Sequence, residues 1–305
     1  MLTLSLKCIG GAVLFVATGN TFFALFMEIC AYFIRRLRNR SLLKELSGKW
    51  AIITGCTDGI GLGIAREMAN NGINLILISR TQEKLDKVEE ELSKKVKTKT
   101  VQMDFENEID FAASLAEVKE YSPHILVNNV GVAESGPTAF MEHTFKSIDR
   151  IVKVNITNTV RITQEYISWD KSPKDKKYIL TTGSMLGSIP SPFQQIYAGT
   201  KAFLQVWSES ISTELPGYHA EVFMTGLVCS KLSGAKKPNL FVPSADLYGK
   251  CCVHTFGTCA MTYPYFPHAL LNLFACAFPR GVIGMAMAKF GVHIRKIKQK
   301  SGKKK

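Results

Sequence analysis

Short apolar segments alternate with amphipathic helical segments between residue 48 and about residue 228, and this alternation restricts the fold more than any other feature of the sequence. Such a pattern is typical of a parallel sheet covered by helices. We therefore expect an α/β fold built on a doubly wound parallel sheet. The segments expected to form its strands are 51–54, 74–79, 100–103, 125–128, 178–182 and 221–224.

The N-terminal part of the chain contains a long apolar segment. It runs from Cys8 to Phe33 with one acidic residue, Glu28, and about 20 apolar residues are enough to cross a bilayer. A cleaved signal peptide is the alternative, but the segment is too long and no small-x-small cleavage site precedes the cations that follow. We expect an N-terminal transmembrane helix with the rest of the chain facing the cytosol, because Lys7 precedes the segment and more cations follow it, namely Arg35, Arg36, Arg38, Arg40 and Lys44.

The sequence has a formal net charge of +13, and the basic excess lies mainly after this apolar segment and near the C-terminus. That placement suits an anionic membrane surface better than nucleic acid, although the final lysines fit a solvated tail equally well. The eight cysteines include no C-x-x-C pair and no histidine at a zinc-site spacing. We expect reduced thiols, no bound metal and no nucleic-acid partner.

The region after residue 230 is apolar but interrupted. Two interpretations of residues 263–290 stay open, a lipid-facing or re-entrant cover and a set of packed core helices. The basic tail, residues 295–305, is placed to rest on phospholipid headgroups. Four residues divide residues 263–290 into pieces too short for an ordinary spanning helix, namely Pro264, Pro267, Pro279 and Arg280.

A glycine-rich turn follows the first expected strand directly and leads into a helical segment. Glycines let the backbone turn tightly and approach a pyrophosphate, and the helix N-terminus adds unpaired N–H groups and a favourable dipole. This position between a strand and a helix predicts a Rossmann-type dinucleotide site rather than a plain turn. The residues expected to bind the cofactor here are Gly55, Thr57, Asp58, Gly59, Ile60 and Gly61.

The end of the second expected strand indicates which dinucleotide is bound. Sites for NAD usually place a carboxylate there for the ribose hydroxyls, whereas this sequence has Ser79 and Arg80. A guanidinium pairs with a 2′-phosphate, so the sequence predicts NADPH/NADP as the cofactor. The alternative is that Arg80 only begins a solvated helix. Asp104, after the third strand, is placed either to reach the adenine or to cap a helix.

Three residues have types and positions suited to ketone chemistry. Tyr197 and Lys201 are four positions apart in a helical segment, so their side chains share one face. A free tyrosine has a pKa of about 10, and a neighbouring cation stabilises its phenolate. Ser184 ends the fifth expected strand, at the edge where parallel α/β sheets place reactive groups, and its hydroxyl can bond a ketone oxygen.

With these residues in place, the chain resembles the short-chain dehydrogenase/reductase family from residue 48 to about residue 230. The resemblance implies that Tyr197 is the general acid and that Ser184 orients the carbonyl. It also implies that Lys201 holds the nicotinamide ribose and lowers the tyrosine pKa. The matching motifs, in the family's order, are Thr54-Gly55-x-x-x-Gly59-x-Gly61, Asn128-Asn129-Val130-Gly131, Asn155, Ser184 and Tyr197-x-x-x-Lys201.

The same resemblance assigns roles to residues around this group. Asn155 would position a water that relays protons to Lys201, and Asn128 and Gly131 would shape the floor beneath the cofactor. Ser230 keeps a hydroxyl where the family commonly has a threonine near the nicotinamide amide. One departure is Thr225-Gly226 after the sixth strand, where the family usually has Pro-Gly, so this turn is expected to be less rigid.

The apolar N-terminus, the basic run after it and the extended C-terminus resemble the endoplasmic-reticulum branch of the family. That branch contains very-long-chain 3-oxoacyl-CoA reductases and 17-beta-hydroxysteroid dehydrogenases. The resemblance implies NADPH-dependent reduction of a ketone on a lipid-like substrate, with 3-oxoacyl-CoA as the first choice and a steroid or retinoid as the alternative. Basic side chains that could meet CoA phosphates, or form a solvated loop, are Lys231, Lys236 and Lys237.

The expected organisation has three parts. Residues 1–45 form a membrane anchor and basic juxtamembrane segment, residues 46–230 a catalytic core, and residues 231–305 a substrate-covering region with a basic tail. The expected location is the endoplasmic-reticulum membrane with the core facing the cytosol. Expected partners are membrane lipids and either a second copy of the chain or elongation-complex proteins. Outside the enzymes, the alternative is a non-catalytic dinucleotide-binding scaffold, since fold alone does not guarantee chemistry.

Overall fold

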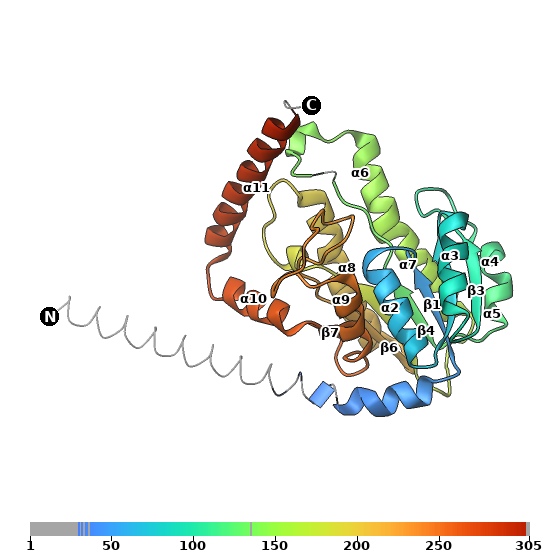
Figure 1. Ribbon diagram of the computed structural model, residues 1–305. Coiled ribbons are helices and arrows are strands. Elements are labelled where there is room, and N and C mark those ends of the chain that lie inside the picture. Colours follow the sequence, from blue (N-terminus) through green and yellow to red (C-terminus); the bar gives the residue numbers. More distant parts are fainter. Residues whose placement is uncertain (1–29, 31, 33, 36, 135, 303–305) are drawn as a thin grey trace.

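The computed structural model describes residues 30–302 except residues 31, 33, 36 and 135. Its centre is a parallel sheet in the spatial order β3-β2-β1-β4-β5-β6-β7 (Figure 1). The chain reverses direction across the sheet between β1 and β4, which is the doubly wound arrangement and confirms the predicted fold class. The strands are β1 (Trp50–Thr54), β2 (Asn74–Ser79), β3 (Thr98–Gln102), β4 (Ile125–Asn128), β5 (Lys177–Thr182), β6 (Tyr218–Phe223) and β7 (Met261–Thr262).

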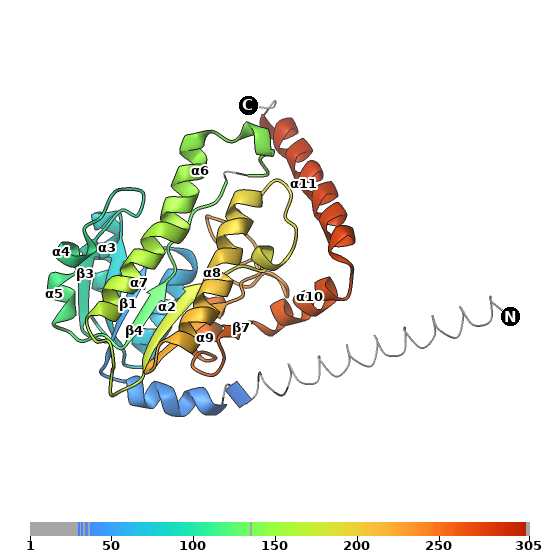
Figure 2. The ribbon, with the colours of Figure 1, turned by 180° about the vertical axis from the view of Figure 1, so that it is seen from behind.

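Helices cover both faces of this sheet (Figures 1 and 2). One core lies beneath α2 (Gly59–Asn70), α3 (Gln82–Leu92) and α9 (Ala245–Val253). The other lies beneath α4 (Phe111–Ser114), α5 (Ala116–Lys119), α7 (Asn158–Ser168) and α8 (Gln195–Glu214). The remaining elements are η1 (Phe140–Glu142), α6 (Phe145–Val152), η2 (Lys153–Thr157), η3 (Met185–Ser188), α10 (Phe266–Cys276) and α11 (Arg280–Gly302).

The central strands are apolar along their whole length because successive side chains point to opposite helical layers. In β1, Ala51 and Ile53 join the core beneath α2, whereas Ile52 joins the core beneath α7. In β2, Leu75 likewise joins the core beneath α2, and Ile76 joins the core beneath α7. Burial on both faces explains why these strands could be found from short apolar runs in the sequence.

Strand boundaries differ from the prediction where polar residues take part in pairing. The edge strand β3 begins at Thr98 rather than at residue 100, because its register with β2 starts with the pair Leu75↔Thr98. The strand β6 begins at Tyr218 rather than at residue 221 and includes His219, whose ring is hydrogen-bonded to Glu221 at 3.0 Å. The strand β7 was not predicted, since two residues carry no periodic pattern.

The predicted transmembrane helix lies outside the described residues, apart from residues 30 and 32. The chain after it is helical over residues 37–46 and is attached to the fold. Asn39 is buried and donates its side-chain amide to the carbonyl of Phe256 at 2.9 Å, while Leu43 and Leu46 belong to the core beneath α2. The N-terminal side of the described chain is therefore fixed to the α9 side of the sheet.

The C-terminal region forms two helices, α10 and α11. The predicted break at Pro279 and Arg280 is confirmed, because α10 ends at Cys276 and α11 begins at Arg280. Pro267 does not interrupt a helix, since it lies in the first turn of α10, where proline is compatible with a helix start. Among the described residues of α11, Gly291 alone is buried, so this helix is not a packed core helix. Of the helices that the structure describes, none is by itself long and apolar enough to span a membrane; α10 and α11 qualify only as a pair bent by 114°.

The cysteines whose side chains the structure describes are free thiols: Cys30, Cys56, Cys229, Cys251, Cys252 and Cys259. Within the described residues, no group of histidine, cysteine, aspartate and glutamate side chains is arranged to hold a metal ion.

Candidate active site

The carboxyl ends of β1, β4 and β5 meet at one edge of the sheet, where side-chain hydrogen bonds fix them. The hydroxyl of Thr54, the last residue of β1, donates to the carbonyl of Val127 at 3.1 Å. It also accepts from the backbone N–H groups of Asn129 and Val130, at 2.9 and 3.1 Å. The Asn129 amide donates to the Thr54 carbonyl at 3.0 Å and its oxygen accepts from the Thr182 hydroxyl at 3.2 Å. Three strand ends thus hold the turn after β1.

That turn leaves no space for side chains on its inner side. Gly55 and Gly59 have φ values of 65° and 55°, which favour glycine. A Cβ at Gly61 would lie 2.3 Å from the Gly55 carbonyl oxygen and 2.4 Å from the Asn129 amide nitrogen. The turn continues into the N-terminus of α2, where Asp58 accepts from the Gly59 N–H at 2.8 Å. A backbone cradle of this kind at a helix N-terminus fits a dinucleotide pyrophosphate.

The loop after β6 closes over the same turn. The Ser230 Cβ would lie 3.3 Å from a Cβ added to Gly59, so this predicted cofactor residue borders the cradle. The next residue, Lys231, forms an ion pair with Asp58 at 2.5 Å. Lys231 therefore reaches the dinucleotide turn, whereas the sequence had suggested a place at the mouth of the substrate pocket.

Arg80 follows β2 and is exposed at the same sheet edge. Its Nη1 lies 3.4 Å from Glu106 Oε1, a long contact, and Arg150 holds the same oxygen at 2.8 Å. The hydroxyls of Thr57 and Ser79 are 2.9 Å apart. Because Arg150 also pairs with Glu106 and the Arg80 contact is long, Glu106 does not fully engage the Arg80 guanidinium.

Two other residues expected at the cofactor have structural roles. Asp104 accepts from the backbone N–H of Glu106 at 3.1 Å and so closes a turn; it does not cap a helix, because the next helix, α4, has Asp110 as its N-cap. Ile60 is partly buried and packs against the core beneath α2. Contacts of either residue with a nucleotide stay predictions.

Ser184, Tyr197 and Lys201 meet at the carboxyl end of β5. The Ser184 side chain is hydrogen-bonded to the Tyr197 side chain and also accepts from the backbone N–H of Leu186 at 3.2 Å. The Lys201 Nζ lies 5.7 Å from the centre of the Tyr197 ring and donates to the Thr182 carbonyl at 2.6 Å. The structure brings these three side chains into one group, next to the glycine-rich turn.

Burial dominates the protonation of Tyr197 and Lys201. It raises the pKa of Tyr197 to about 12; the hydrogen bond from Ser184 opposes this rise and the charge of Glu134 adds to it. Burial lowers the pKa of Lys201 to about 8. Tyr197 is therefore protonated at neutral pH, which is the form that a proton donor needs. The lowering of the Tyr197 pKa by Lys201 stays a prediction.

Asn155 lies in the π-helical turn η2 and is fully buried. Its carboxamide bonds both backbone groups of Val132, accepting from the N–H at 2.8 Å and donating to the carbonyl at 2.9 Å. It also donates to the hydroxyl of Thr200 at 3.0 Å, and Thr200 donates to the Tyr197 carbonyl at 2.7 Å. Asn155 thus joins the segment after β4 to the catalytic helix α8, and its role with a relay water stays a prediction.

Asn128 and Gly131 lie on the same segment. The Asn128 amide donates to Thr163 at 2.8 Å, and its buried oxygen has no hydrogen-bond partner within the described residues. A Cβ at Gly131 would lie 3.5 Å from Asn155 Oδ1 and 3.7 Å from the Lys201 Nζ. Glycine at this position therefore leaves open the space in front of Lys201, which fits the predicted floor of a cofactor site.

Sequence reasoning missed several groups of this site. Thr200 could have been found, because it lies within the Tyr197–Lys201 motif, but Thr182 contributes a backbone carbonyl that no pattern reveals. His268 of α10 was also missed: its Nδ1 accepts from the Gly226 N–H at 3.1 Å. His268 therefore restrains the turn after β6 that the missing proline was expected to loosen.

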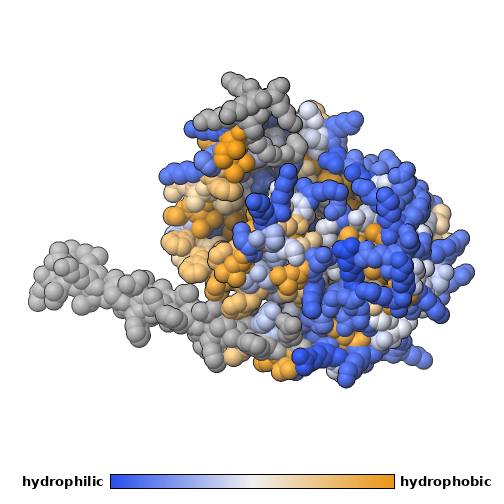
Figure 3. Space-filling view, viewed as in Figure 1, coloured by the Kyte–Doolittle hydropathy of each residue, from blue (hydrophilic) through white to orange (hydrophobic). Residues whose placement is uncertain are grey.

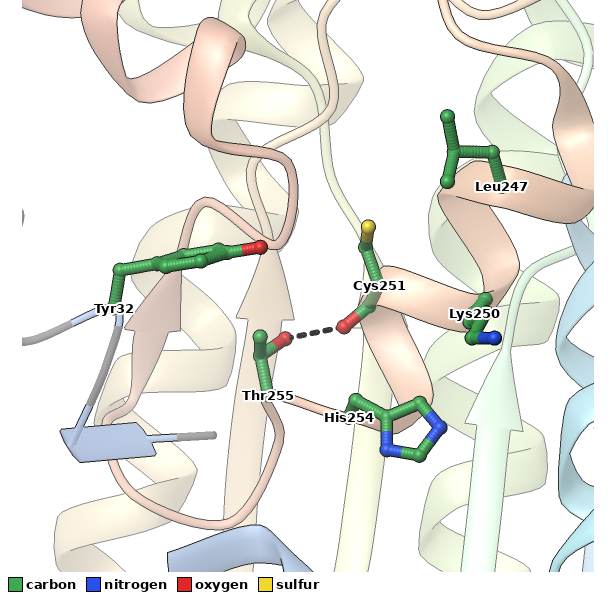
Figure 4. Close-up of a pocket in the computed structure, with 6 residues that line it drawn as sticks. All are labelled: Tyr32, Leu247, Lys250, Cys251, His254 and Thr255. Carbon is green, nitrogen blue, oxygen red and sulfur yellow. Dashed lines mark hydrogen bonds between the residues drawn. The ribbon is translucent and has the colours of Figure 1, made fainter. Parts of the chain in front are cut away.

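A separate cavity of about 260 Å³ lies beside α9 (Figure 4). The Thr255 hydroxyl donates to the Cys251 carbonyl at 2.8 Å in its wall. None of its lining residues belongs to the glycine-rich cradle or to the Ser184 group, so the cavity is not the site of chemistry. The lining residues are Tyr32, Leu247, Lys250, Cys251, His254 and Thr255.

Comparison with known proteins agrees with this site. Residues 49–239 match the family described as short chain dehydrogenase, and this match covers the cradle and the Ser184 group. The chain belongs to the short-chain dehydrogenase family. This short-chain dehydrogenase is a nicotinamide-dinucleotide-dependent oxidoreductase, and the bare backbone of its glycine-rich turn is suited to such a cofactor.

Similar proteins come from fungi and from fish. The chain is 35% identical over 245 residues to a very-long-chain 3-oxoacyl-CoA reductase of Scheffersomyces stipitis, covering 74% of this chain and 70% of that one. It is 34% identical over 277 residues to the protein of the same name from Schizosaccharomyces pombe, covering 83% and 76%. It is 35% identical over 257 residues to very-long-chain 3-oxoacyl-CoA reductase-A of Danio rerio, covering 82% and 80%.

Solved structures share the fold of this short-chain dehydrogenase. A 3-ketoacyl-(acyl-carrier-protein) reductase from Brucella melitensis, complexed with NADH, superimposes with a TM-score of 0.58 at 26% identity, covering 62% of this chain and 79% of that one. A short-chain dehydrogenase from Sphingobium yanoikuyae, in complex with NADPH, gives a TM-score of 0.58 at 22% identity, covering 82% and 95%.

Thr54→Val should destabilise the dinucleotide cradle. The change keeps the side-chain shape but leaves the N–H groups of Asn129 and Val130 without their acceptor, which should cost about 1–3 kcal/mol of unfolding free energy. Urea unfolding and NADPH titration of the detergent-solubilised protein would measure the loss of stability and the weaker cofactor binding. Thr54→Ser keeps the hydroxyl and is the matched control. Equal stability of the two variants would contradict the role given to this hydroxyl.

Proposed function

We propose that this short-chain dehydrogenase reduces the 3-oxo group of a long-chain acyl-CoA to a secondary alcohol with NADPH. The observation that carries the proposal is the grouping of Ser184, Tyr197 and Lys201 beside the glycine-rich cradle. The choice of substrate is supported by the relatives, since those of Scheffersomyces, Schizosaccharomyces and Danio are named very-long-chain 3-oxoacyl-CoA reductases.

The chain's own residues would act on the ketone oxygen. Bound NADPH would supply the hydride that the ketone carbon receives. The hydroxyls of Ser184 and Tyr197 would hold the oxygen, and Tyr197 would give it a proton as negative charge develops. Lys201, held by the Thr182 carbonyl, would bind the nicotinamide ribose and stabilise the phenolate left on Tyr197. Asn155 would place the water through which the tyrosine regains its proton.

Tyr197→Phe should abolish turnover while NADPH binding is retained. The variant keeps the ring but removes the proton donor, so kcat should fall by about 100-fold or more. NADPH oxidation would be followed with detergent-solubilised protein, offered a long-chain 3-oxoacyl-CoA and a 17-ketosteroid in parallel. Near-parental activity of the variant would contradict the mechanism. Preference of the parent for the ketosteroid would overturn the acyl-CoA assignment and favour a hydroxysteroid dehydrogenase.

The preference for NADPH over NADH is assigned to Arg80. Its guanidinium is exposed and its contact with Glu106 is long. Arg80 directly follows Ser79, whose hydroxyl lies 2.9 Å from that of Thr57. These three groups can donate to the 2′-phosphate that distinguishes the two cofactors. A carboxylate that would instead favour NAD is absent from the end of β2, at Ser79 and Arg80.

Arg80→Ala should reduce the selectivity for NADPH. The loss of a charge-assisted hydrogen bond, about 1.5–3 kcal/mol, corresponds to a fall of about 10- to 150-fold in the ratio of kcat/KM for NADPH to that for NADH. Steady-state kinetics with both cofactors would measure this ratio. Lys87→Ala, on the helix that follows, is the control for a general loss of positive charge. An unchanged ratio in the Arg80 variant would refute the assignment.

We also propose that the three predicted parts of the chain work at the endoplasmic-reticulum membrane, with residues 1–45 as anchor, 46–230 as catalytic core and 231–305 as cover. The support from the described residues is apolar side chains gathered over α10 and α11 (Figure 3). Exposed cations, Lys289 and Lys296, lie among them and can meet anionic headgroups. The exposed apolar residues are Leu271, Phe274, Phe278, Val282, Met285, Phe290, Val292 and Ile297. A homodimer or elongation-complex partner stays a prediction.

Lipid contact of α10 and α11 can be tested without removing the predicted anchor. In full-length protein reconstituted into vesicles, Phe274→Trp and Phe290→Trp should add fluorescence that brominated phospholipids quench, because apolar side chains at the interface enter the acyl boundary. Tyr121→Trp, after α5 on the opposite side of the molecule (Figures 1 and 2), is the control. Equal quenching of all three variants would contradict the proposed contact of α10 and α11 with lipid.

A further inference from the structure

The catalytic helix α8 begins without a cap of its own. Its N-cap residue, Gln194, makes no side-chain hydrogen bond to the first turn. The first N–H groups of a helix need an acceptor from outside the helix. One of them, the N–H of Tyr197, donates to Glu134 Oε1 at 3.2 Å. A carboxylate from the segment after β4 therefore takes the place of the cap, directly at the catalytic residue.

The segment that carries Glu134 is fixed on both sides of it. On one side, Val132 is bonded through both backbone groups to Asn155. On the other side, the N–H of Thr138 donates to the carbonyl of Phe193 at 2.8 Å. The position of Glu134 relative to α8 is thus set by two connections that do not involve its own side chain.

The chain entering α8 needs this restraint. Phe193 has a φ of 67°, a left-handed conformation that a bulky residue adopts only when its surroundings enforce it. Its ring lies 5.3 Å from the guanidinium carbon of Arg295, and its carbonyl accepts the Thr138 bond. Without Glu134, the strained residue before α8 and the missing side-chain cap would leave the first turn of the helix, which includes Tyr197, without a fixed position.

Glu134 also acts on Tyr197 through its negative charge, since its carboxylate is bonded to the backbone of the same residue. Its Oε2 is buried and has no hydrogen-bond partner within the described residues, so its charge is little screened. Lys201 on the same helix and the Ser184 hydroxyl after β5 lie beside Tyr197. Two other elements packed against α8 carry charged or titratable residues: Lys146, Asp149 and Arg150 on α6, and His219 and Glu221, which are bonded to each other, on β6. The turn η2 also packs against α8 and carries Asn155, which is uncharged, and Lys153, which is paired with Glu108 at 2.7 Å. The turn η3 carries no titratable residue.

We propose that Glu134 is a positioning residue that caps the catalytic helix and keeps Tyr197 in its protonated form, the form that donates a proton in ketone reduction. The inference rests on the proposed function and adds the pH range over which Tyr197 carries the proton that reduction needs. The carboxylate disfavours a second negative charge beside it, whereas Ser184 and Lys201 favour the phenolate that exists after proton transfer. Glu134 therefore favours Tyr197 before it gives up its proton, and Lys201 favours the phenolate that is formed afterwards.

The pH dependence follows from the sign of this interaction. Glu134 raises the pKa of Tyr197, so the neutral hydroxyl persists to higher pH. Reduction needs the hydroxyl and is lost as pH rises through that pKa, whereas oxidation needs the phenolate and is gained there. Removing the negative charge should lower the pKa and move both transitions to lower pH.

The test compares two variants of the full-length protein. Glu134→Gln keeps a side-chain carbonyl that can accept from the Tyr197 N–H but removes the charge, whereas Glu134→Ala removes both. The Gln variant should unfold near the parental temperature. Its rise in NADP-dependent oxidation of a 3-hydroxyacyl-CoA should occur roughly half a pH unit or more below that of the parent. The Ala variant should show the same pH shift, a lower unfolding temperature and a further loss of kcat with little change in KM.

Controls separate this inference from the substrate assignment. Glu120→Gln, an exposed carboxylate after α5, should leave the pH profile unchanged. If the parent prefers a steroid, the same profiles are measured with that steroid and its alcohol, so failure of the acyl-CoA assignment leaves this test intact. A parental profile in the Gln variant would overturn the electrostatic role. Equal unfolding temperatures and kcat values for the Gln and Ala variants would overturn the capping role.

Discussion

The carboxamide of Asn155 joins the two halves of the active site, and the catalytic geometry depends on it. It bonds both backbone groups of Val132 and the hydroxyl of Thr200. An amide can accept two hydrogen bonds and donate two, so these three bonds fix the buried side chain and leave one acceptor position for the proposed water. Because Glu134 follows Val132 and Tyr197 precedes Thr200, this one side chain sets the distance between the cap and the proton donor.

In the proposed mechanism, opposing groups set the acidity of Tyr197. Burial and the Glu134 carboxylate raise the pKa of Tyr197 and the Ser184 hydrogen bond lowers it, while Lys201, 5.7 Å from the centre of the ring, is proposed to stabilise the phenolate. Burial lowers the pKa of Lys201 to about 8. The same ammonium group donates a hydrogen bond to the Thr182 carbonyl. The pKa values of Tyr197 and Lys201 therefore depend on burial and on a few polar groups held in place around them.

The C-terminal helix α11 connects this site to the proposed membrane face. A Cβ at Gly284 would lie 3.3 Å from Pro190, and one at Gly291 would lie 2.5 Å from the Phe193 ring, so glycines at a seven-residue spacing let the helix approach the loop before α8. The opposite side of α11 exposes apolar residues such as Val282.

Local patterns in the sequence determined the order of strands and helices, the glycine-rich turn and the shared helical face of Tyr197 and Lys201, because each depends on residues close together in the chain. Tertiary structure alone decided that Glu134 caps α8, that His268 holds Gly226 and that Arg295 lies over Phe193. These partners come from elements distant in sequence, and their meeting depends on how helices pack on the sheet edge. A single hydrogen bond between such elements leaves no periodic signal, whereas burial on a strand or helix face does.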